Sequence, residues 1–136
     1  MLKIHRKIKY ALLALKHISH KPQDELATAK EICSRFDIPF DPTSRVLQIM
    51  TQNGVLKAEQ GAHGGYRLTR DLSMLTLFDL SHMVIGIFAI TDCCQRPAEC
   101  DRIAFCDLRG PMGNLNNRLQ EVFKEIKVIE MITDHE

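Results

Sequence analysis

The chain has 136 residues, of which 45% are hydrophobic and 26% are charged, a size and composition typical of one globular domain and not of a disordered or collagen-like chain. The longest uncharged apolar run, residues 83–91, is less than half of a membrane span. Basic residues near the start alternate with apolar ones and form no signal segment, so we expect a cytoplasmic protein with no membrane partner.

The net charge of +1 conceals a difference between the two halves of the chain. Residues 1–70 hold 12 lysines and arginines against six carboxylates, a net of +6. Residues 71–136 hold six lysines and arginines against 11 carboxylates, a net of −5. This asymmetry predicts that the first half faces a polyanion.

The first quarter of the chain predicts two helices. Apolar residues at helical spacing over residues 4–19 indicate a helix with one buried face. A capping box, in which Thr28 and Glu31 each satisfy a backbone donor of the other, begins a short second helix. His17 and His20 near the end of the first helix are interpreted as solvated or as caps of its last carbonyls, and a metal-binding pair is the alternative.

A third helix is predicted to begin at Asp41-Pro42, an N-cap acid followed by proline, and to stop at Gly54. Two short helices joined by a tight turn are the plan of a helix-turn-helix, whose second helix enters the major groove of DNA. The candidates for contact with base edges or phosphates are the polar residues at the start and on the outer face of this helix: Thr43, Ser44, Arg45 and Gln48.

Two short strand-like runs, residues 55–59 and 66–69, flank six residues that include three glycines. A β-hairpin directly after a helix-turn-helix is a wing, and its glycines allow close approach to another surface. His63 and Arg67 are its candidate contacts with phosphate or the minor groove, with simple exposure as the alternative for His63. Two further candidates for phosphate contact lie near the start of the first helix: Lys3 and Arg6.

The second half predicts a helix over residues 76–88 and a last helix that starts near Pro111. We therefore expect a winged helix-turn-helix domain over residues 1–75 and a second part, residues 76–136, that carries a cysteine loop and a dimerisation helix. A heptad stripe on the last helix favours packing along a partner helix in a homodimer, with an ordinary core helix as the alternative. Its apolar residues are Met112, Leu115, Leu119, Val122, Ile126 and Ile129.

Four of the five cysteines cluster between positions 93 and 106, which indicates metal or redox chemistry in a reducing compartment. Cys94, Cys100 and Cys106 recur at intervals of six, and the chain has no C-x-x-C pair of the kind that zinc fingers use. The spacing favours an iron–sulfur cluster, while zinc and simple thiol oxidation remain alternatives. Cys33 is interpreted as a buried hydrophobe, and Cys93 is left over.

The helix-turn-helix, the glycine-rich wing over residues 61–68, the C-x5-C-x5-C loop and a long last helix occur in one order over residues 2–132. This combination resembles the Rrf2 family of winged-helix regulators, of the IscR and NsrR type. The resemblance implies a mainly α fold with a small hairpin wing and a homodimer crossed through the C-terminal helix. It also implies a [2Fe-2S] or [4Fe-4S] cluster on Cys94, Cys100 and Cys106 whose state controls DNA affinity.

The fourth cluster ligand is where the sequence departs from the family pattern. Some members use a histidine three residues after the last cysteine, where this chain has Arg109, and others use an acidic residue in the first helix, where it has Lys9. Neither side chain normally ligates iron. His5 lies one helical turn before Lys9 and is the leading substitute. An open position is a further alternative, as are three acidic residues: Glu99, Asp101 and Asp107.

Together these features predict a homodimeric transcriptional regulator that binds double-stranded DNA and senses redox state, nitric oxide or iron and cluster status. A zinc-bound or thiol-switched winged-helix regulator is the first alternative, and a small thiol oxidoreductase is the second. We expect no enzymatic activity and no small-molecule substrate, because the sequence has no P-loop, dinucleotide fingerprint or serine–histidine–aspartate constellation.

Overall fold

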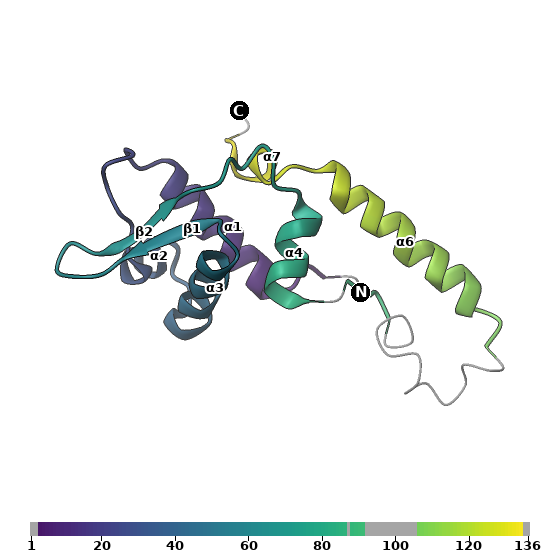
Figure 1. Ribbon diagram of the computed structural model, residues 1–136. Helices are drawn as coiled ribbons and strands as arrows, with labels where there is room; N and C mark the ends of the chain where they lie inside the picture. Colours follow the sequence, from purple (N-terminus) through teal and green to yellow (C-terminus); the bar gives the residue numbers. More distant parts are fainter. Residues whose placement is uncertain (1–2, 87, 92–105, 135–136) are drawn as a thin grey trace.

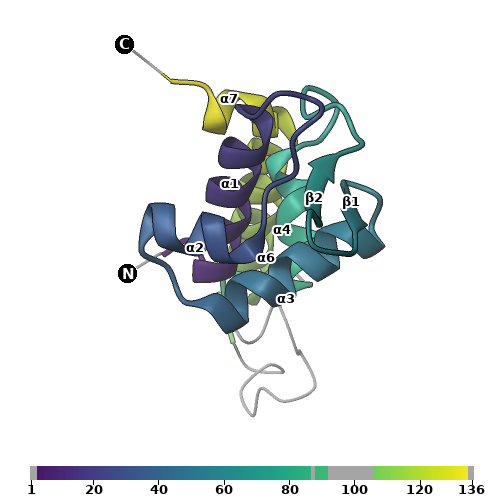
Figure 2. The same cartoon turned by 90° about the vertical axis from the view of Figure 1, so that its left-hand side faces the viewer.

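The computed structural model describes residues 3–86, 88–91 and 106–134. Helices α1 to α4 and a β-hairpin gather into one lobe, and the long helix α6 lies on the side opposite the hairpin (Figures 1 and 2). This arrangement confirms the prediction of a mainly helical chain with one hairpin. The elements are α1 Arg6–Ser19, α2 Ala29–Phe36, α3 Phe40–Gln52, β1 Leu56–Glu59, β2 Gly65–Leu68, α4 Leu77–Ile85, α6 Arg109–Glu125 and α7 Val128–Ile132.

Helix α1 is the central element, and α2, α3, α4 and α7 all pack against it. Its buried side recurs at helical spacing, as the sequence predicts, through Ile8, Ala11, Leu15 and Ile18. The helix begins two residues later than predicted because His5 is its N-cap and accepts a hydrogen bond at Nδ1 from the backbone of the helix's second residue.

The capping box predicted at the start of α2 is half formed. Thr28 Oγ1 accepts a hydrogen bond from the backbone N–H of Glu31 at 3.1 Å. The carboxylate of Glu31 does not complete the box, because it binds Lys21 Nζ at 2.6 Å and His17 Nε2 at 2.9 Å. Glu31 therefore ties the first helix of the helix-turn-helix to the end of α1.

Helix α3 begins at Phe40 and not at Pro42, which corrects the predicted start. Asp37 ends α2 in the left-handed conformation (φ 52°), and the chain turns back into helix directly after Pro39, which is the N-cap and supplies no side-chain hydrogen bond. Gly54, with φ 77°, follows the end of α3 as predicted.

The hairpin is held against the loop that precedes α2. Its strands pair in antiparallel register, and the backbones of Tyr66 and Ala27 exchange two hydrogen bonds of 2.8 and 3.0 Å. A Cβ on Gly65 would lie 2.8 Å from the carbonyl oxygen of Ala27, and one on Gly64 would lie 2.5 Å from that of Glu59. The close approach that these glycines allow is therefore an approach to the chain's own backbone.

The predicted last helix is two helices, which corrects the continuous heptad stripe. Helix α6 ends at Glu125, Ile126 is extended, and Ile129 belongs to α7. The break arises because this segment pairs with residues 75–77: Leu77 N–H donates to Ile126 and Val128 N–H donates to Leu75, both at 2.8 Å.

One hydrophobic core holds the lobe together and takes residues from both sides of position 75. Leu72 and Leu75 lie in it, and so do Leu80 of α4 and Val128 and Ile132 of α7. Helix α7 thus closes the core over α1, although it comes from the end of the chain. Among the residues that the structure describes, no helix is long and apolar enough to span a membrane.

Candidate nucleic-acid interface and cysteine segment

The outer face of α3 presents polar side chains on successive turns. Arg45 and Gln48 are exposed, and Ser44 is half-buried beside them. None of their side chains makes a hydrogen bond or ion pair with another described residue of the chain, so these polar groups are free to bind a ligand. The opposite face of α3 is anchored in the core by Val46, Leu47 and Met50.

Thr43, by contrast, is fully buried, which corrects its predicted place on the outer face. It precedes Val46 and Leu47 by three and four residues, so it shares their inward-facing side of the helix. Its hydroxyl has no hydrogen-bond partner among the described residues. Thr43 therefore belongs to the core and not to the interface.

Phe40 was not singled out by the sequence, because the predicted helix began after it. The structure places it as the first residue of α3 with 52% of its surface exposed, outside the hydrophobic core. Ser44 and Gln48 follow it at intervals of four along the helix. That spacing is the signal in the sequence from which its position could have been predicted.

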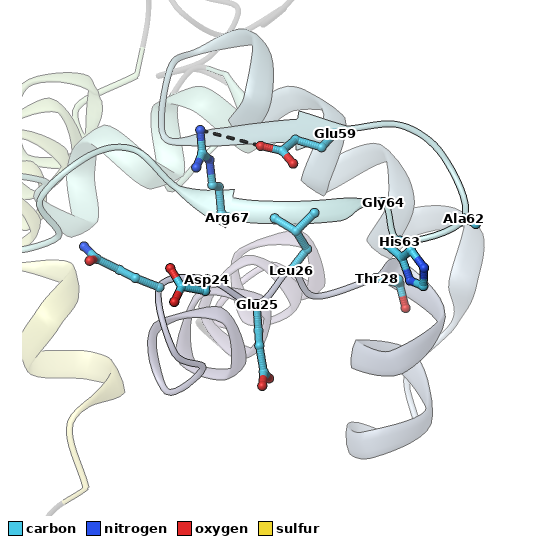
Figure 3. A pocket seen from close by; sticks show the side chains of 10 residues that line it. Asp24, Glu25, Leu26, Thr28, Glu59, Ala62, His63, Gly64 and Arg67 are labelled. Atoms are coloured by element: carbon cyan, nitrogen blue, oxygen red, sulfur yellow. Dashed lines mark ion pairs between the residues drawn. The ribbon is translucent and has the colours of Figure 1, made fainter.

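The wing's arginine is engaged within the hairpin. Arg67 reaches from β2 across to Glu59 on β1, with 3.6 Å between Nη2 and Oε1 (Figure 3). Its side chain is 42% exposed, but its Nε is buried without a hydrogen-bond partner in the part of the chain described. A phosphate that binds Arg67 must therefore compete with a carboxylate.

His63 lies exposed in the loop of the hairpin, and it lines the same pocket as Thr28 (Figure 3). Between the hairpin and the loop before α2 is a pocket of about 640 Å³ that these two residues help to line. Asp24 and Glu25 of the loop also line it, together with Glu59. The lining of this pocket thus holds three carboxylates against one arginine and one histidine, which the net charge of the first half does not reveal.

The basic residues before and at the start of α1 are exposed, as expected. Lys3 and His5 lie at the edge of a largely apolar groove of about 830 Å³ between α1, α4 and α6, while Arg6 opens the helix. The apolar lining of this groove comes from Ile4, Ile8, Ile85, Phe88, Ala89, Ile90, Leu115, Leu119 and Phe123.

His5 has a structural role that bears on metal binding. Its Nδ1 accepts a hydrogen bond from Lys7 N–H at 3.1 Å, so a neutral ring carries its proton on Nε2. Binding iron through Nε2 requires that proton to move to Nδ1, and binding through Nδ1 uses the same lone pair. In either case, binding of iron by His5 removes the hydrogen bond with which His5 caps α1.

Cys106 is exposed and lies three residues before the start of α6. Cys94 and Cys100 lie outside the described residues, as do Cys93, Glu99 and Asp101. The N-cap of α6, Leu108, supplies no side-chain hydrogen bond, so the uncapped N-terminus favours negative charge nearby. Cysteine sulfurs are the soft ligands that hold iron–sulfur clusters, so an exposed Cys106 has suitable chemistry for one. Within the described ranges no three metal-binding side chains are placed around one point.

Cys33, His17 and His20 have local partners. Cys33 is half-buried, and its Sγ lies 3.7 Å from the carbonyl oxygen of Pro39. His20 Nδ1 lies 2.6 Å from the carbonyl oxygen of Lys16 and caps the end of α1, as one of the two interpretations predicted. His17 binds Glu31 and packs edge-on against the ring of Phe36.

Partial burial acts to raise the pKa of Glu31, but hydrogen bonds and charge from Lys21 and His17 outweigh it and hold that pKa below its ordinary value. Glu31 is therefore ionised at neutral pH. Its carboxylate links α2 to His17 of α1, whereas α3 packs directly against α1.

Comparison with known protein families identifies the family of this chain. The family model described as Rrf2, iron-dependent transcriptional regulator, matches residues 4–134. The chain belongs to the Rrf2 family. Rrf2 proteins are DNA-binding transcriptional regulators, and this chain is a regulator of that kind.

Individual Rrf2 relatives and solved structures are distant in sequence. A protein of Aquifex aeolicus described as an HTH-type transcriptional regulator is 24% identical over 95% of this chain and 90% of its own. CymR, the global cysteine regulator of B. subtilis, has a TM-score of 0.73 at 19% identity and covers 98% of this chain and 100% of its own. IscR of T. potens has a TM-score of 0.71 at 19% identity, over 96% and 86%. At these identities the structures establish the shared winged-helix fold.

Proposed function

We propose that the protein is a homodimeric Rrf2 regulator whose affinity for double-stranded DNA is controlled by an iron–sulfur cluster. The proposed ligands are Cys94, Cys100 and Cys106. The observation that carries the proposal is a C-x5-C-x5-C segment that leads directly into α6 of a winged-helix fold. The description of the family as iron-dependent regulators supports it.

On the DNA side, α3 enters the major groove with Ser44, Arg45 and Gln48 toward base edges and phosphates. The exposure of Arg45 and Gln48 supports this placement, and so does the lack of side-chain hydrogen bonds and ion pairs from all three to other described residues. His63 and Arg67 of the wing meet the backbone or the minor groove beside it. Phosphate contacts dominate the affinity, so the logarithm of the binding constant falls with the logarithm of salt concentration by about 0.9 per phosphate neutralised.

On the sensor side, a cluster supplies a centre that oxygen, nitric oxide or iron loss can alter. The chain's own contribution is the short link between Cys106 and α6, because a constraint on this thiol is also a constraint on the start of the helix. His5 is the proposed fourth ligand, and its ligation is coupled to the loss of the N-cap of α1.

The homodimer is proposed to form along α6. Leu115 and Val122 on this helix are 46% and 47% exposed, and Leu119 lines the apolar groove beside α1. Apolar side chains of this size on one exposed stripe are typical of a surface that a second helix covers. Because α6 ends at Glu125, the proposed stripe stops at Val122 and leaves out Ile126 and Ile129.

The test is anaerobic purification followed by absorbance spectroscopy and native mass spectrometry. We expect a dimer with cluster mass and visible absorbance, and we expect the triple change of Cys94, Cys100 and Cys106 to alanine to remove both cluster signals. The matched control is the double change of Cys33 and Cys93 to alanine, which keeps the cluster. Visible absorbance that survives the triple change refutes the ligand assignment.

The second candidate is a regulator switched by a thiol or stabilised by zinc, which the exposure of Cys106 favours. Metal analysis that finds one zinc per chain and no sulfide selects the zinc form. A metal-free protein whose DNA affinity changes with peroxide and recovers with dithiothreitol selects the thiol switch.

A further inference from the structure

The first residue of α3 is an exposed aromatic side chain. Phe40 has 52% of its surface accessible, whereas Phe36, four residues earlier, packs against the core. No ring contact or cation–π contact involves Phe40 among the described residues. An apolar ring in this position loses contact with water only when something binds to α3.

Its place on the helix identifies the ligand that can cover it. In a helix-turn-helix, residues at the N-terminal end of the second helix contact base edges in the major groove. Phe40 stands at that end of α3, and Ser44 and Gln48 follow it at intervals of four along the helix. A side chain that begins such a row meets the groove floor next to the bases that Ser44 and Gln48 reach.

Only one base offers an apolar group in the major groove. Adenine, guanine and cytosine present hydrogen-bond donors and acceptors there, whereas thymine adds a C5-methyl group, which apolar side chains contact. We infer that Phe40 reads the methyl group of one thymine in each half-site. This inference rests on the proposed placement of α3 in the major groove, and it makes Phe40 a specificity-determining residue.

The test starts with selection of bound sequences from random double-stranded DNA by the full-length protein, purified anaerobically. Each thymine of the selected half-site is then replaced by deoxyuridine, which removes the methyl group and keeps the base pair. We expect one replacement per half-site to weaken binding about fourfold, the effect of one methyl group buried in an apolar contact. Replacement at the other positions leaves the affinity unchanged.

Three variants show whether Phe40 is responsible. Phe40→Ala is expected to bind the thymine and deoxyuridine sites equally, and Phe40→Leu to keep part of the difference. Arg45→Ala weakens binding to both sites alike and keeps the fourfold ratio. Because Phe40 is exposed, all three variants are expected to keep the thermal unfolding temperature of the parent, which verifies that they are folded.

Two results overturn the inference. The first is a selected half-site in which the wild type binds thymine and deoxyuridine equally at every position while Arg45→Ala still weakens binding; α3 is then in the groove, but Phe40 reads no methyl group. The second is a thymine preference that survives Phe40→Ala. If Arg45→Ala and Gln48→Ala both leave DNA binding intact, the placement of α3 is itself wrong.

Discussion

At the scale of single residues, Thr43 lies in the helix proposed to bind DNA, but its side chain is buried, so its contribution to packing can be tested apart from DNA binding. Its hydroxyl is buried without a partner, and an unpaired buried hydroxyl lowers stability. Thr43→Val keeps the shape and removes the hydroxyl, so we expect the free energy of unfolding to rise by about 1 kcal/mol in urea titrations. DNA affinity is expected to stay unchanged. A folded Thr43→Val protein with weakened DNA binding would return Thr43 to the interface.

His5 offers a second residue-scale prediction, because its capping and its proposed ligand role can be tested apart. His5→Ala removes both, whereas His5→Ser keeps a good N-cap oxygen and removes the imidazole. We expect His5→Ala to lower the free energy of unfolding of the cluster-free protein by about 1 kcal/mol and His5→Ser to leave it nearly unchanged. If His5 ligates iron, both variants alter the absorbance spectrum of the reconstituted protein; an unaltered spectrum in both excludes it.

Glu31 predicts a pH dependence of stability. Its pKa in the folded chain lies below the ordinary value of 4.5, so its carboxylate stabilises the fold fully at neutral pH. That contribution is lost as the pH falls below 4.5 and through the lowered pKa. Glu31→Gln is therefore expected to be less stable than the wild type at pH 7, by less than about 1 kcal/mol because the side chain is partly exposed.

Thermal unfolding at several pH values checks this expectation, and the difference between Glu31→Gln and the wild type should shrink steadily as the pH falls below 4.5. The control is Glu121→Gln, whose carboxylate pairs with Lys124 on the surface of α6. A Glu31→Gln difference that persists undiminished at acid pH would contradict the assigned role of the carboxylate.

At the scale of elements, the wing contains a carboxylate, on Glu59, that competes with DNA phosphate for Arg67. Glu59 pairs with Arg67 across the hairpin, so Glu59→Gln frees the guanidinium and removes a negative charge that DNA approaches. We expect DNA affinity to rise about threefold, in keeping with the strength of an exposed ion pair. The measurement is a fluorescence-anisotropy titration at two salt concentrations.

The matched control for the wing is again Glu121→Gln, which makes the same change of charge on α6, away from the hairpin. An equal gain of affinity in both variants would assign the effect to net charge and not to Arg67. A gain in Glu59→Gln that is lost in the double change Glu59→Gln with Arg67→Ala supports the competition.

Most element positions follow from local signals in the sequence, such as the stop at Gly54, and these were predictable. The predicted elements differ from the observed ones in the C-terminal region because of contacts between segments that are distant in the sequence. Nothing near Ile126 shows that the chain must extend there, because the cause is its pairing with residues 75–77. Thr43 differs from its predicted place for another reason: its spacing from Val46 and Met50 indicates the core, whereas its polar side chain favours the surface.

The candidate site was predictable to the extent that it depends on one helix. Arg45 and Gln48 lie on the exposed face that helical periodicity predicts for them. Phe40 is not predicted as part of the site, because the predicted helix starts two residues after the observed start of α3. The pairing of Arg67 with Glu59 depends on the register of two strands, which residue types alone do not determine.

At the scale of the whole molecule, apolar residues of the C-terminal region divide into two groups with different roles. Ile132 is buried against the core, whereas Leu115 and Val122 are exposed. Ile132→Ala is expected to lower the free energy of unfolding by about 3 kcal/mol.

The double change of Leu115 and Val122 to glutamine is expected to keep the monomer's thermal stability and to shift native mass spectra from dimer to monomer. A dimer that persists in this variant would contradict the proposed stripe.

The break after Glu125 has a mechanical consequence. Backbone pairing of Thr76 with Lys127 clamps the C-terminal end of α6 to the lobe. Cys106 lies at the other end, three residues before the start of the helix. A helix of 17 residues is about 25 Å long, and the side chains of Asn116 and Gln120 in α6 also bond to the backbone at Phe88 and Ile90. A tilt of about 5° at the clamp displaces the cysteine end by about 2 Å. Conversely, a small movement at Cys106 reaches the lobe as a torque on the bridge between Thr76 and Lys127, which lies beside the buried side chains of α7.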